Sequence, residues 1–271
     1  MMTNYDSDAI GPPAIHELRE LVRYRDLLRI LVSNSIKTRY KRSSLGVVWT
    51  LLNPLLNTLV LTIAFSQIFR FEVENYAVYI LSGLVFWNFF AQTTTLAMNQ
   101  LIWGSNLLRR IYVPRSIFSV AVVGNGLANF FLALIPLGVV MLLLGQPFTV
   151  ALIFIPLAAV LMTMFILGVT LLVSTLAVFF VDVVDIYSVV LSAVFYLTPV
   201  IYPISIVPEP VRTFMAWNPL YIMLELIRGP VYLGVFPGVA QVAAAAVISV
   251  GTLVLGWLVF TSRQEEFAYR L

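Results

Sequence analysis

From Val150 to Phe180 the chain reads VALIFIPLAAVLMTMFILGVTLLVSTLAVFF, and no Asp, Glu, Lys or Arg interrupts it. A helix crosses the hydrocarbon core of a membrane with about 20 mostly apolar residues, so this run exceeds one crossing. We expect it to be tilted or to extend into the cytoplasm. Composition agrees along all 271 residues: 61% are apolar and 11% are charged, against about 45–50% and about 25% in soluble proteins. The sequence therefore predicts an all-α protein that crosses the membrane several times.

Five further apolar runs complete a predicted bundle of six transmembrane helices. We place the six spans at 47–69, 77–98, 117–144, 150–180, 186–202 and 239–260. The chain then divides into a cytoplasmic tail (1–46), a transmembrane domain (47–260) and a short cytoplasmic C-terminal tail (261–271). The absence of cysteine and the apolar composition exclude a disulfide scaffold and a disordered chain.

The basic residues predict which way the spans face, because short cytoplasmic loops carry an excess of Lys and Arg. Thirteen of the sixteen basic residues fall on one side of this arrangement. Eight of them lie in the N-terminal tail, and the others are Arg109, Arg110, Arg115, Arg263 and Arg270. We therefore expect both termini to be cytoplasmic. The net charge of +3 is then a topology signal, and we expect no nucleic-acid partner.

Few residues could carry catalysis or power transport. The chain contains no GxxxxGK[ST] nucleotide-binding loop, and its single histidine, His16, lies in the tail, so we expect neither a metal site nor a catalytic dyad. Asp182 and Asp185 lie at a predicted cytoplasmic helix junction, where capping or solvated turn residues are favoured over an intramembrane aspartate pair. No Asp, Glu, Lys or Arg falls inside the spans, whereas ion-coupled carriers place such groups near the midplane. Any transport would draw its energy from outside this chain.

Uncharged polar residues recur at helical spacing in several of the predicted spans. They are Asn53 and Asn57 in the first span, Asn88, Gln92, Thr95 and Asn99 along the second, and Ser188, Ser192 and Tyr196 in the fifth. A polar stripe without charge suits a hydroxyl-rich substrate, which needs hydrogen-bond partners and little fixed charge. Hydrogen bonding between helices is the alternative, because Asn, Gln, Ser and Thr commonly hold membrane helices together. The residues alone leave both interpretations open.

Two segments outside the spans have patterns of their own. From Leu18 to Tyr40 the tail predicts an amphipathic helix on the cytoplasmic membrane surface, with arginine stems that reach the headgroups. Between 203 and 238, closely spaced prolines break an apolar stretch into pieces too short to cross a membrane. We expect two short re-entrant helices there, on the outer side. Glu225 and Arg228 are spaced to pair within them, as a structural contact rather than a substrate-binding one.

Six motifs follow one another along nearly the whole chain. They are RYKRSSLGVVWTLLNPLL (Arg39 to Leu56), LSGLVFWNFF (Leu81 to Phe90), NLLRRIYVPRSI (Asn106 to Ile117), FFVDVVDI (Phe179 to Ile186), LTPVIYPISIVP (Leu197 to Pro208) and WNPLYIMLELIRG (Trp217 to Gly229). Together and in this order they resemble the membrane permeases of ABC transporters that export polysaccharides or teichoic acids. The resemblance rests on the set, since each motif alone is weak.

The resemblance implies a homodimer bound to two copies of a separate ATP-binding subunit. That subunit would bind ATP and Mg²⁺, so this chain would hold no cofactor and would not be an enzyme on its own. The substrate would be a glycan or polyol-phosphate polymer on a lipid carrier. The location would be the bacterial cytoplasmic (inner) membrane.

The resemblance also implies roles for individual residues. The contact with the ATPase would involve Asn106, Leu107, Leu108, Arg109, Arg110, Tyr112, Pro114, Arg115, Asp182 and Asp185. A gate on the outer side would involve Pro199, Tyr202, Pro203, Trp217, Asn218, Pro219, Glu225 and Arg228. Arg39, Lys41 and Arg42 suit the entry of a lipid headgroup, although the positive-inside rule also accounts for them.

Two other functions stay open at this point. One is an ABC permease that exports a drug or a small lipid, and the other is an intramembrane enzyme or scaffold. The polar stripes favour a sugar over an apolar drug. A neighbouring gene for a P-loop ATPase would exclude the enzyme or scaffold, and neighbouring glycosyltransferase genes would favour polysaccharide export.

Overall fold

The computed structural model describes residues 13–40, 48–68, 74–103, 113–264 and 266–267. Every regular element in these residues is helical. The elements are α1 (Pro13–Arg23), α2 (Arg25–Tyr40), α3 (Val48–Ile68), α4 (Tyr76–Trp103), α6 (Ser116–Leu143), η2 (Val150–Phe154), α7 (Ile155–Phe179), α8 (Val183–Leu197), η3 (Ile204–Ile206), α9 (Glu209–Ala216), α10 (Pro219–Arg228), η4 (Gly229–Leu233) and α11 (Val239–Arg263). Within the described residues, α6, η2 with α7, and α11 are the stretches long and apolar enough to cross a membrane.

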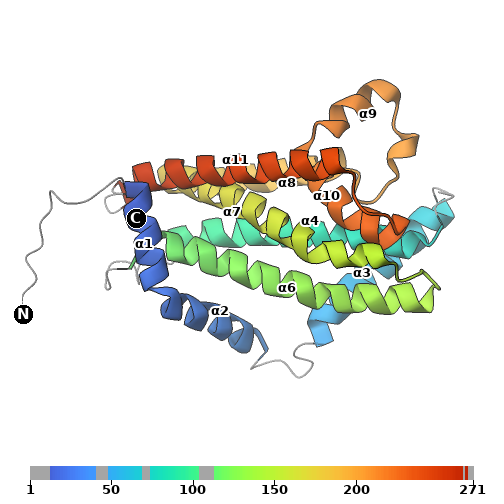
Figure 1. The fold of residues 1–271 in the computed structure, drawn as a ribbon, viewed down its shortest axis with the longest axis horizontal. Helices are drawn as coiled ribbons and strands as arrows, with labels where there is room; N and C mark the ends of the chain where they lie inside the picture. Colours follow the sequence, from blue (N-terminus) through green and yellow to red (C-terminus); the bar gives the residue numbers. More distant parts are fainter. Residues whose placement is uncertain (1–12, 41–47, 69–73, 104–112, 265, 268–271) are drawn as a thin grey trace, which may run out of the picture.

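The long helices α4, α6, α7 and α11 run side by side and form the body of the molecule (Figure 1). α4 packs against both α6 and α7. Its Phe89 ring packs 5.4 Å from the ring of Phe130 in α6, and its Phe90 ring packs 5.9 Å from that of Phe165 in α7. These rings belong to the largest apolar cluster of the described residues. The core is therefore built around α4.

Helices α7 and α11 approach each other most closely at two glycines. A Cβ atom added to Gly168 would lie 2.4 Å from the carbonyl oxygen of Thr252, and one added to Gly256 would lie 2.3 Å from that of Gly168. Small residues allow such close packing of membrane helices, in which van der Waals contact drives association. Backbone against backbone therefore joins these two helices.

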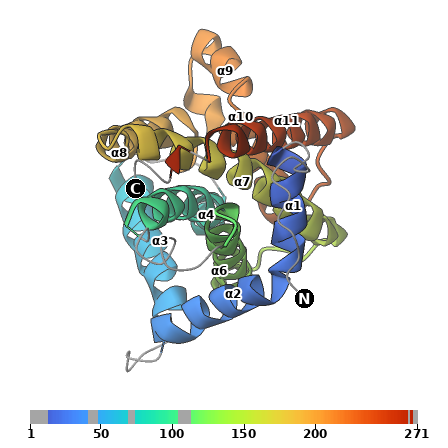
Figure 2. The same ribbon diagram turned by 90° about the vertical axis from the view of Figure 1, so that its left-hand side faces the viewer.

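The N-terminal tail forms two helices that meet at Tyr24 at an angle (Figure 2). The prediction of one helix from Leu18 to Tyr40 was wrong in this respect. Leu21 of α1 and Leu27 of α2 both pack in the apolar cluster at the start of α6, although Leu27 falls off the apolar side of a single helix. The bend at Tyr24 lets both segments bury apolar side chains against the same neighbour.

Each predicted span has a helix at its place, and the fifth differs most from its prediction. α8 ends at Leu197 instead of 202, because Pro199 disfavours helical geometry in the residue before it. Thr198 is accordingly extended (φ −104°, ψ 123°). Residues 203–238 contain short helices, as expected, and α9 projects away from the bundle (Figure 1), while the re-entrance of two of them into the membrane stays a prediction. Six membrane crossings stay a prediction.

Candidate functional site

The predicted stripe on α4 lies on a side of the helix that its neighbours do not cover completely. Its residues are Asn88, Gln92, Thr95 and Asn99. Gln92 is exposed, and the other three are half-buried. The Asn99 amide donates a hydrogen bond to the Thr95 carbonyl of the same helix (3.1 Å). Other sides of α4 carry the aromatic contacts with α6 and α7, so the polar side is available to water, substrate or a second subunit.

Helix α8 lies on the outside of the bundle, and none of its residues is buried. Side-chain contacts attach it to α4. The Tyr187 hydroxyl donates to Thr94 Oγ1 (2.8 Å), and the Phe195 ring lies edge-on, 5.0 Å from that of Trp87. The predicted stripe of α8 comprises Ser188, Ser192 and Tyr196, all exposed. Both serine hydroxyls donate to carbonyl groups of their own helix.

The third stripe, on α3, has the same character. Asn53 and Asn57 are exposed, and Asn57 Nδ2 donates to Asn53 Oδ1 (2.8 Å). Across the described residues, the hydrogen bonds donated by the stripe side chains stay within one helix. This favours the pathway interpretation over bonding between helices of one chain. The pathway itself stays a prediction.

At the end of the bundle that carries α9, side chains from two helices hold the turn after α8. Four successive carbonyl oxygens of this turn accept side-chain hydrogen bonds. The pairs are Arg228 to Pro199 (2.9 Å) and Val200 (2.8 Å), Tyr76 to Ile201, and Tyr79 to Tyr202 (2.9 Å). We call Tyr76, Tyr79 and Arg228 the carbonyl clamp. Without these donors, a turn with no ladder or helix partners would leave its carbonyls unsatisfied.

Arg228 is the centre of the clamp and is 3% exposed. Its guanidinium lies 3.4 Å from the Glu225 carboxylate, so the predicted pair is confirmed, and 3.9 Å from the centroid of the Tyr79 ring. Glu225 lies outside the six predicted spans. Burial raises the pKa of its carboxyl above the ordinary value, although the Arg228 charge acts in the opposite direction. A Cβ atom added to Gly83 would lie 2.8 Å from Arg228 Nη2. The guanidinium can therefore occupy this position because residue 83 has no side chain.

Sequence reasoning missed the α4 members of this cluster. From the sequence, no role is predicted for Tyr76, which directly precedes the predicted second span, or for Tyr79 and Gly83 within it. The available signal is two tyrosines spaced i,i+3 at the beginning of a span, where Tyr is enriched at membrane interfaces. That signal does not identify the carbonyl groups they bind, which lie more than 120 residues away along the chain.

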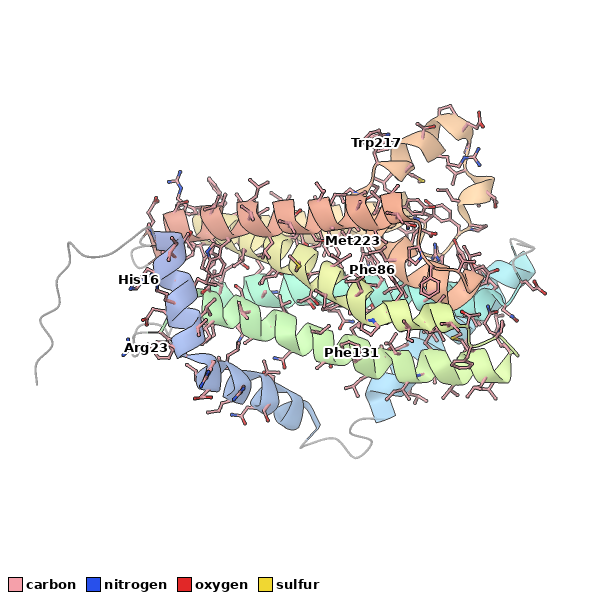
Figure 3. All side chains as sticks on the ribbon, in the orientation of Figure 1. His16, Arg23, Phe86, Phe131, Trp217 and Met223 are labelled. Carbon is pink, nitrogen blue, oxygen red and sulfur yellow. The ribbon has the colours of Figure 1, made fainter. Side chains whose placement is uncertain are left out.

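Some of the remaining predicted gate residues are held by hydrogen bonds or lie at helix ends, and Trp217 lies on the segment that projects from the bundle. The Asn218 carboxamide accepts from the Leu220 N–H (2.9 Å), which caps α10, and donates to Thr198 Oγ1 (3.0 Å). Pro219 is the first residue of α10, and Pro203 directly precedes η3. Trp217 is 83% exposed on the projecting segment (Figure 3). The role of these residues as a gate stays a prediction.

Most of the predicted ATPase-coupling residues fall outside the described residues. Those outside are Asn106, Leu107, Leu108, Arg109, Arg110 and Tyr112, together with the headgroup candidates Lys41 and Arg42 and the side chain of Arg39. Pro114 is buried, and the Arg115 guanidinium lies 5.8 Å from the centroid of the Phe267 ring. The base of α6 is thus held by the C-terminal part of the chain.

The two aspartates at the start of α8 are exposed. Asp182 occupies the N-cap position, but its side chain makes no capping hydrogen bond, so of the two expected roles the structure agrees with the solvated turn residue and not with the cap. Its backbone is already helical (φ −62°, ψ −17°), whereas a capping side chain reaches the first amides from an extended residue. Both carboxylates stay available to a partner.

A family model described as ABC-2 type transporter matches residues 26–232. The O-antigen export system permease protein RfbA of Myxococcus xanthus is 32% identical over 94% of this chain and 98% of its own length. A Klebsiella pneumoniae protein of the same name is 33% identical over 73% of this chain and 77% of its own. The polysialic acid transport protein KpsM of Escherichia coli is 21% identical, with 87% and 92% covered. These matches confirm the resemblance that the six motifs indicated.

Proposed function

This chain belongs to the ABC-2 type transporter family, and we propose that it is the membrane subunit of an ATP-driven exporter of a lipid-linked polysaccharide. The exporter works across the bacterial cytoplasmic membrane, and the polymer is an O-antigen, a capsule chain or a teichoic-acid-like polymer. The observation that carries the proposal is similarity along nearly the whole chain to permeases named for O-antigen export.

The proposed exporter contains two copies of this chain and two copies of a separate ATP-binding subunit. The chain has no P-loop, so ATP and Mg²⁺ bind to the separate subunit. The absence of any buried residue in α8 supports a second copy that covers this helix. In that dimer, the stripes of α3, α4 and α8 line a shared pathway and exchange hydrogen bonds with the hydroxyl groups of the glycan.

The two ends of the bundle have different roles in this proposal. On the cytoplasmic side, Arg39, Lys41 and Arg42 receive the charged lipid headgroup, and the residues from Asn106 to Arg115, with Asp182 and Asp185, contact the ATPase. At the α9 end, the carbonyl clamp and the projecting segment form the gate. The alternative function, export of a drug or small lipid, predicts a pathway without polar stripes.

Deletion of the gene tests the proposal directly. We expect a lipid-linked glycan to accumulate inside the cell and the surface polysaccharide to disappear, because the permease is the route across the membrane. The purified chain alone should show no ATP hydrolysis above background, and hydrolysis should appear on co-purification with its ATP-binding subunit. Robust hydrolysis by the chain alone, or unchanged surface glycan in the deletion strain, would contradict the proposal.

Thiol labelling tests the pathway stripes. The chain has no cysteine, so single cysteines can be introduced without background. We expect Gln92→Cys and Ser192→Cys to react with a water-soluble maleimide in membranes, because water fills a pathway and a thiolate forms there.

Val190 supplies the matched control for Ser192. It lies on the opposite side of α8 and is itself 46% exposed in the single chain. Val190→Cys should stay unreactive, because lipid or packed protein suppresses the thiolate. Equal labelling of the two sides of α8 would refute the assignment of a polar pathway to one face.

A further inference from the structure

Helix α1 lies across one end of the bundle and joins two spans that are distant in sequence (Figures 1 and 2). Leu21 packs with Ile117 and Phe118, at the start of α6, in one apolar cluster. Near the beginning of α1, the Ala14 carbonyl accepts a hydrogen bond from Trp257 Nε1 of α11 (3.1 Å). One short helix therefore connects the beginning of α6 to the last turns of α11.

Glu17, between these two contacts, directs a buried carboxylate to the first residue of α6. It is 5% exposed. Its Oε1 atom accepts hydrogen bonds from both the backbone N–H (3.1 Å) and the hydroxyl group (2.7 Å) of Ser116, which is fully buried. Arg115, the N-cap residue of α6, provides no side-chain hydrogen bond to the helix. Helix α6 therefore takes its capping group from α1.

The contact between Glu17 and Ser116 is costly to break, because of the groups that form it. A carboxylate at a helix N-terminus faces unsatisfied amide groups and the positive end of the helix dipole. Its hydrogen bonds are charge-assisted, and few water molecules can replace them because both residues are buried. A displacement of Ser116 must therefore carry α1 with it or leave a buried carboxylate without donors.

Ser116 directly follows Pro114 and Arg115, which belong to the proposed ATPase contact. Movement of that contact reaches α6 through Ser116, because α6 is its covalent continuation. Through Glu17 the same movement reaches α1, and through the Trp257 bond it reaches α11. Because α11 packs backbone against backbone on α7 at Gly168, the displacement extends to two spans that the coupling residues do not continue into.

We propose that Glu17 is a positioning residue that passes movement of the ATPase contact from Ser116 through α1 to α11. The proposal rests on the proposed function, since it presumes a permease driven by a separate ATPase. Glu17 touches neither nucleotide nor glycan in this scheme. Its contribution is to make α6 and α11 move together, so that ATP hydrolysis is converted into export.

The test compares two rates in the complete permease–ATPase complex. One is ATP hydrolysis by the complex in lipid nanodiscs, and the other is restoration of surface glycan in the deletion strain. Glu17→Ala removes both hydrogen bonds to Ser116 and should leave hydrolysis near the wild-type rate while export falls by at least about tenfold, the factor that one charge-assisted hydrogen bond represents. Glu17→Gln should retain most export, because its amide oxygen still accepts from Ser116. Wild-type export by Glu17→Ala would overturn the proposal.

A double variant separates transmission from local capping. Glu17→Ala with Ser116→Asp returns a carboxylate to the first turn of α6 but not the link to α1. We expect this protein to assemble as well as the wild type and to remain uncoupled, with hydrolysis but little export. Recovery of wild-type export would show that Glu17 only caps α6, and would overturn the proposal.

If Glu17→Ala does not assemble with the ATPase, Trp257→Phe tests the link between α1 and α11 instead. It removes the indole donor to Ala14 and keeps an aromatic ring in the apolar cluster. Export per ATP hydrolysed should fall, and an unchanged ratio would overturn the proposal. A wild-type complex that hydrolyses ATP but moves no glycan would instead contradict the proposed function, so the two failures are distinguishable.

Discussion

A protein in which methionine replaces Arg228 is expected to lose most of its folded population after extraction from the membrane. The guanidinium supplies the donors for the Pro199 and Val200 carbonyls and the charge beside Glu225. Methionine would leave two carbonyls without donors and a largely buried carboxylate without its partner. Breaking a buried ion pair costs about 3–5 kcal/mol, a large part of the about 5–15 kcal/mol by which proteins are stable. Size-exclusion profiles and the midpoint of thermal unfolding in detergent would measure the loss.

Arg212 offers a matched control in the same region of the chain. It pairs with Glu209 at the same i,i+3 spacing (3.2 Å), but the two side chains are 42% and 87% exposed. Exposed pairs contribute about 0–1 kcal/mol, so Arg212→Met should leave the unfolding midpoint almost unchanged. Equal losses in the two variants would show that Arg228 acts as an ordinary surface charge and would contradict the clamp.

Alanine at Gly256 is expected to force α7 and α11 apart. The added methyl group would lie 2.3 Å from the carbonyl oxygen of Gly168, and this neighbour is backbone, which cannot rotate away. Overpacking of a well-packed core costs about 1–3 kcal/mol. We expect a lower thermal midpoint and less folded protein in detergent, measured as for Arg228.

Gly251 lies on the same helix and supplies the control for Gly256. A Cβ atom added there meets no other atom within 4 Å. Gly251→Ala should therefore be neutral or stabilising by up to about 1 kcal/mol, the difference in helix propensity between the two residues. If Gly256→Ala were as stable as Gly251→Ala, the close approach of the two helices would be refuted.

The helices could be predicted from sequence because their signals are local. A run such as Val150 to Phe180 needs no knowledge of its neighbours to indicate a span. The end of α8 was predicted at 202 instead of Leu197, although Pro199 is a local signal for the earlier end. The pairing of Glu225 with Arg228 was predictable for the same reason, since i,i+3 residues are neighbours on any helix. The family resemblance likewise follows from short motifs in a fixed order.

The clamp, the bend in the tail and the contact of Glu17 could not be predicted in this way. Glu17 and Ser116 are 99 residues apart, and neither has a pattern that names the other. The bend at Tyr24 follows from the shape of the α6 surface on which Leu21 and Leu27 pack, and a periodicity within 18–40 contains no information about that surface.

Local patterns in the chain were therefore enough to identify a helical membrane permease of a recognisable family, to place most of its helices and to show which of their faces are polar. Hydropathy and periodicity suffice for this, because each residue's preference for lipid or water acts through its own neighbours in the chain. The three-dimensional contacts were needed to show that Arg228 and two tyrosines hold the turn after α8, and that α1 caps α6. Those contacts depend on which helices become neighbours, and packing among residues distant in the chain determines that.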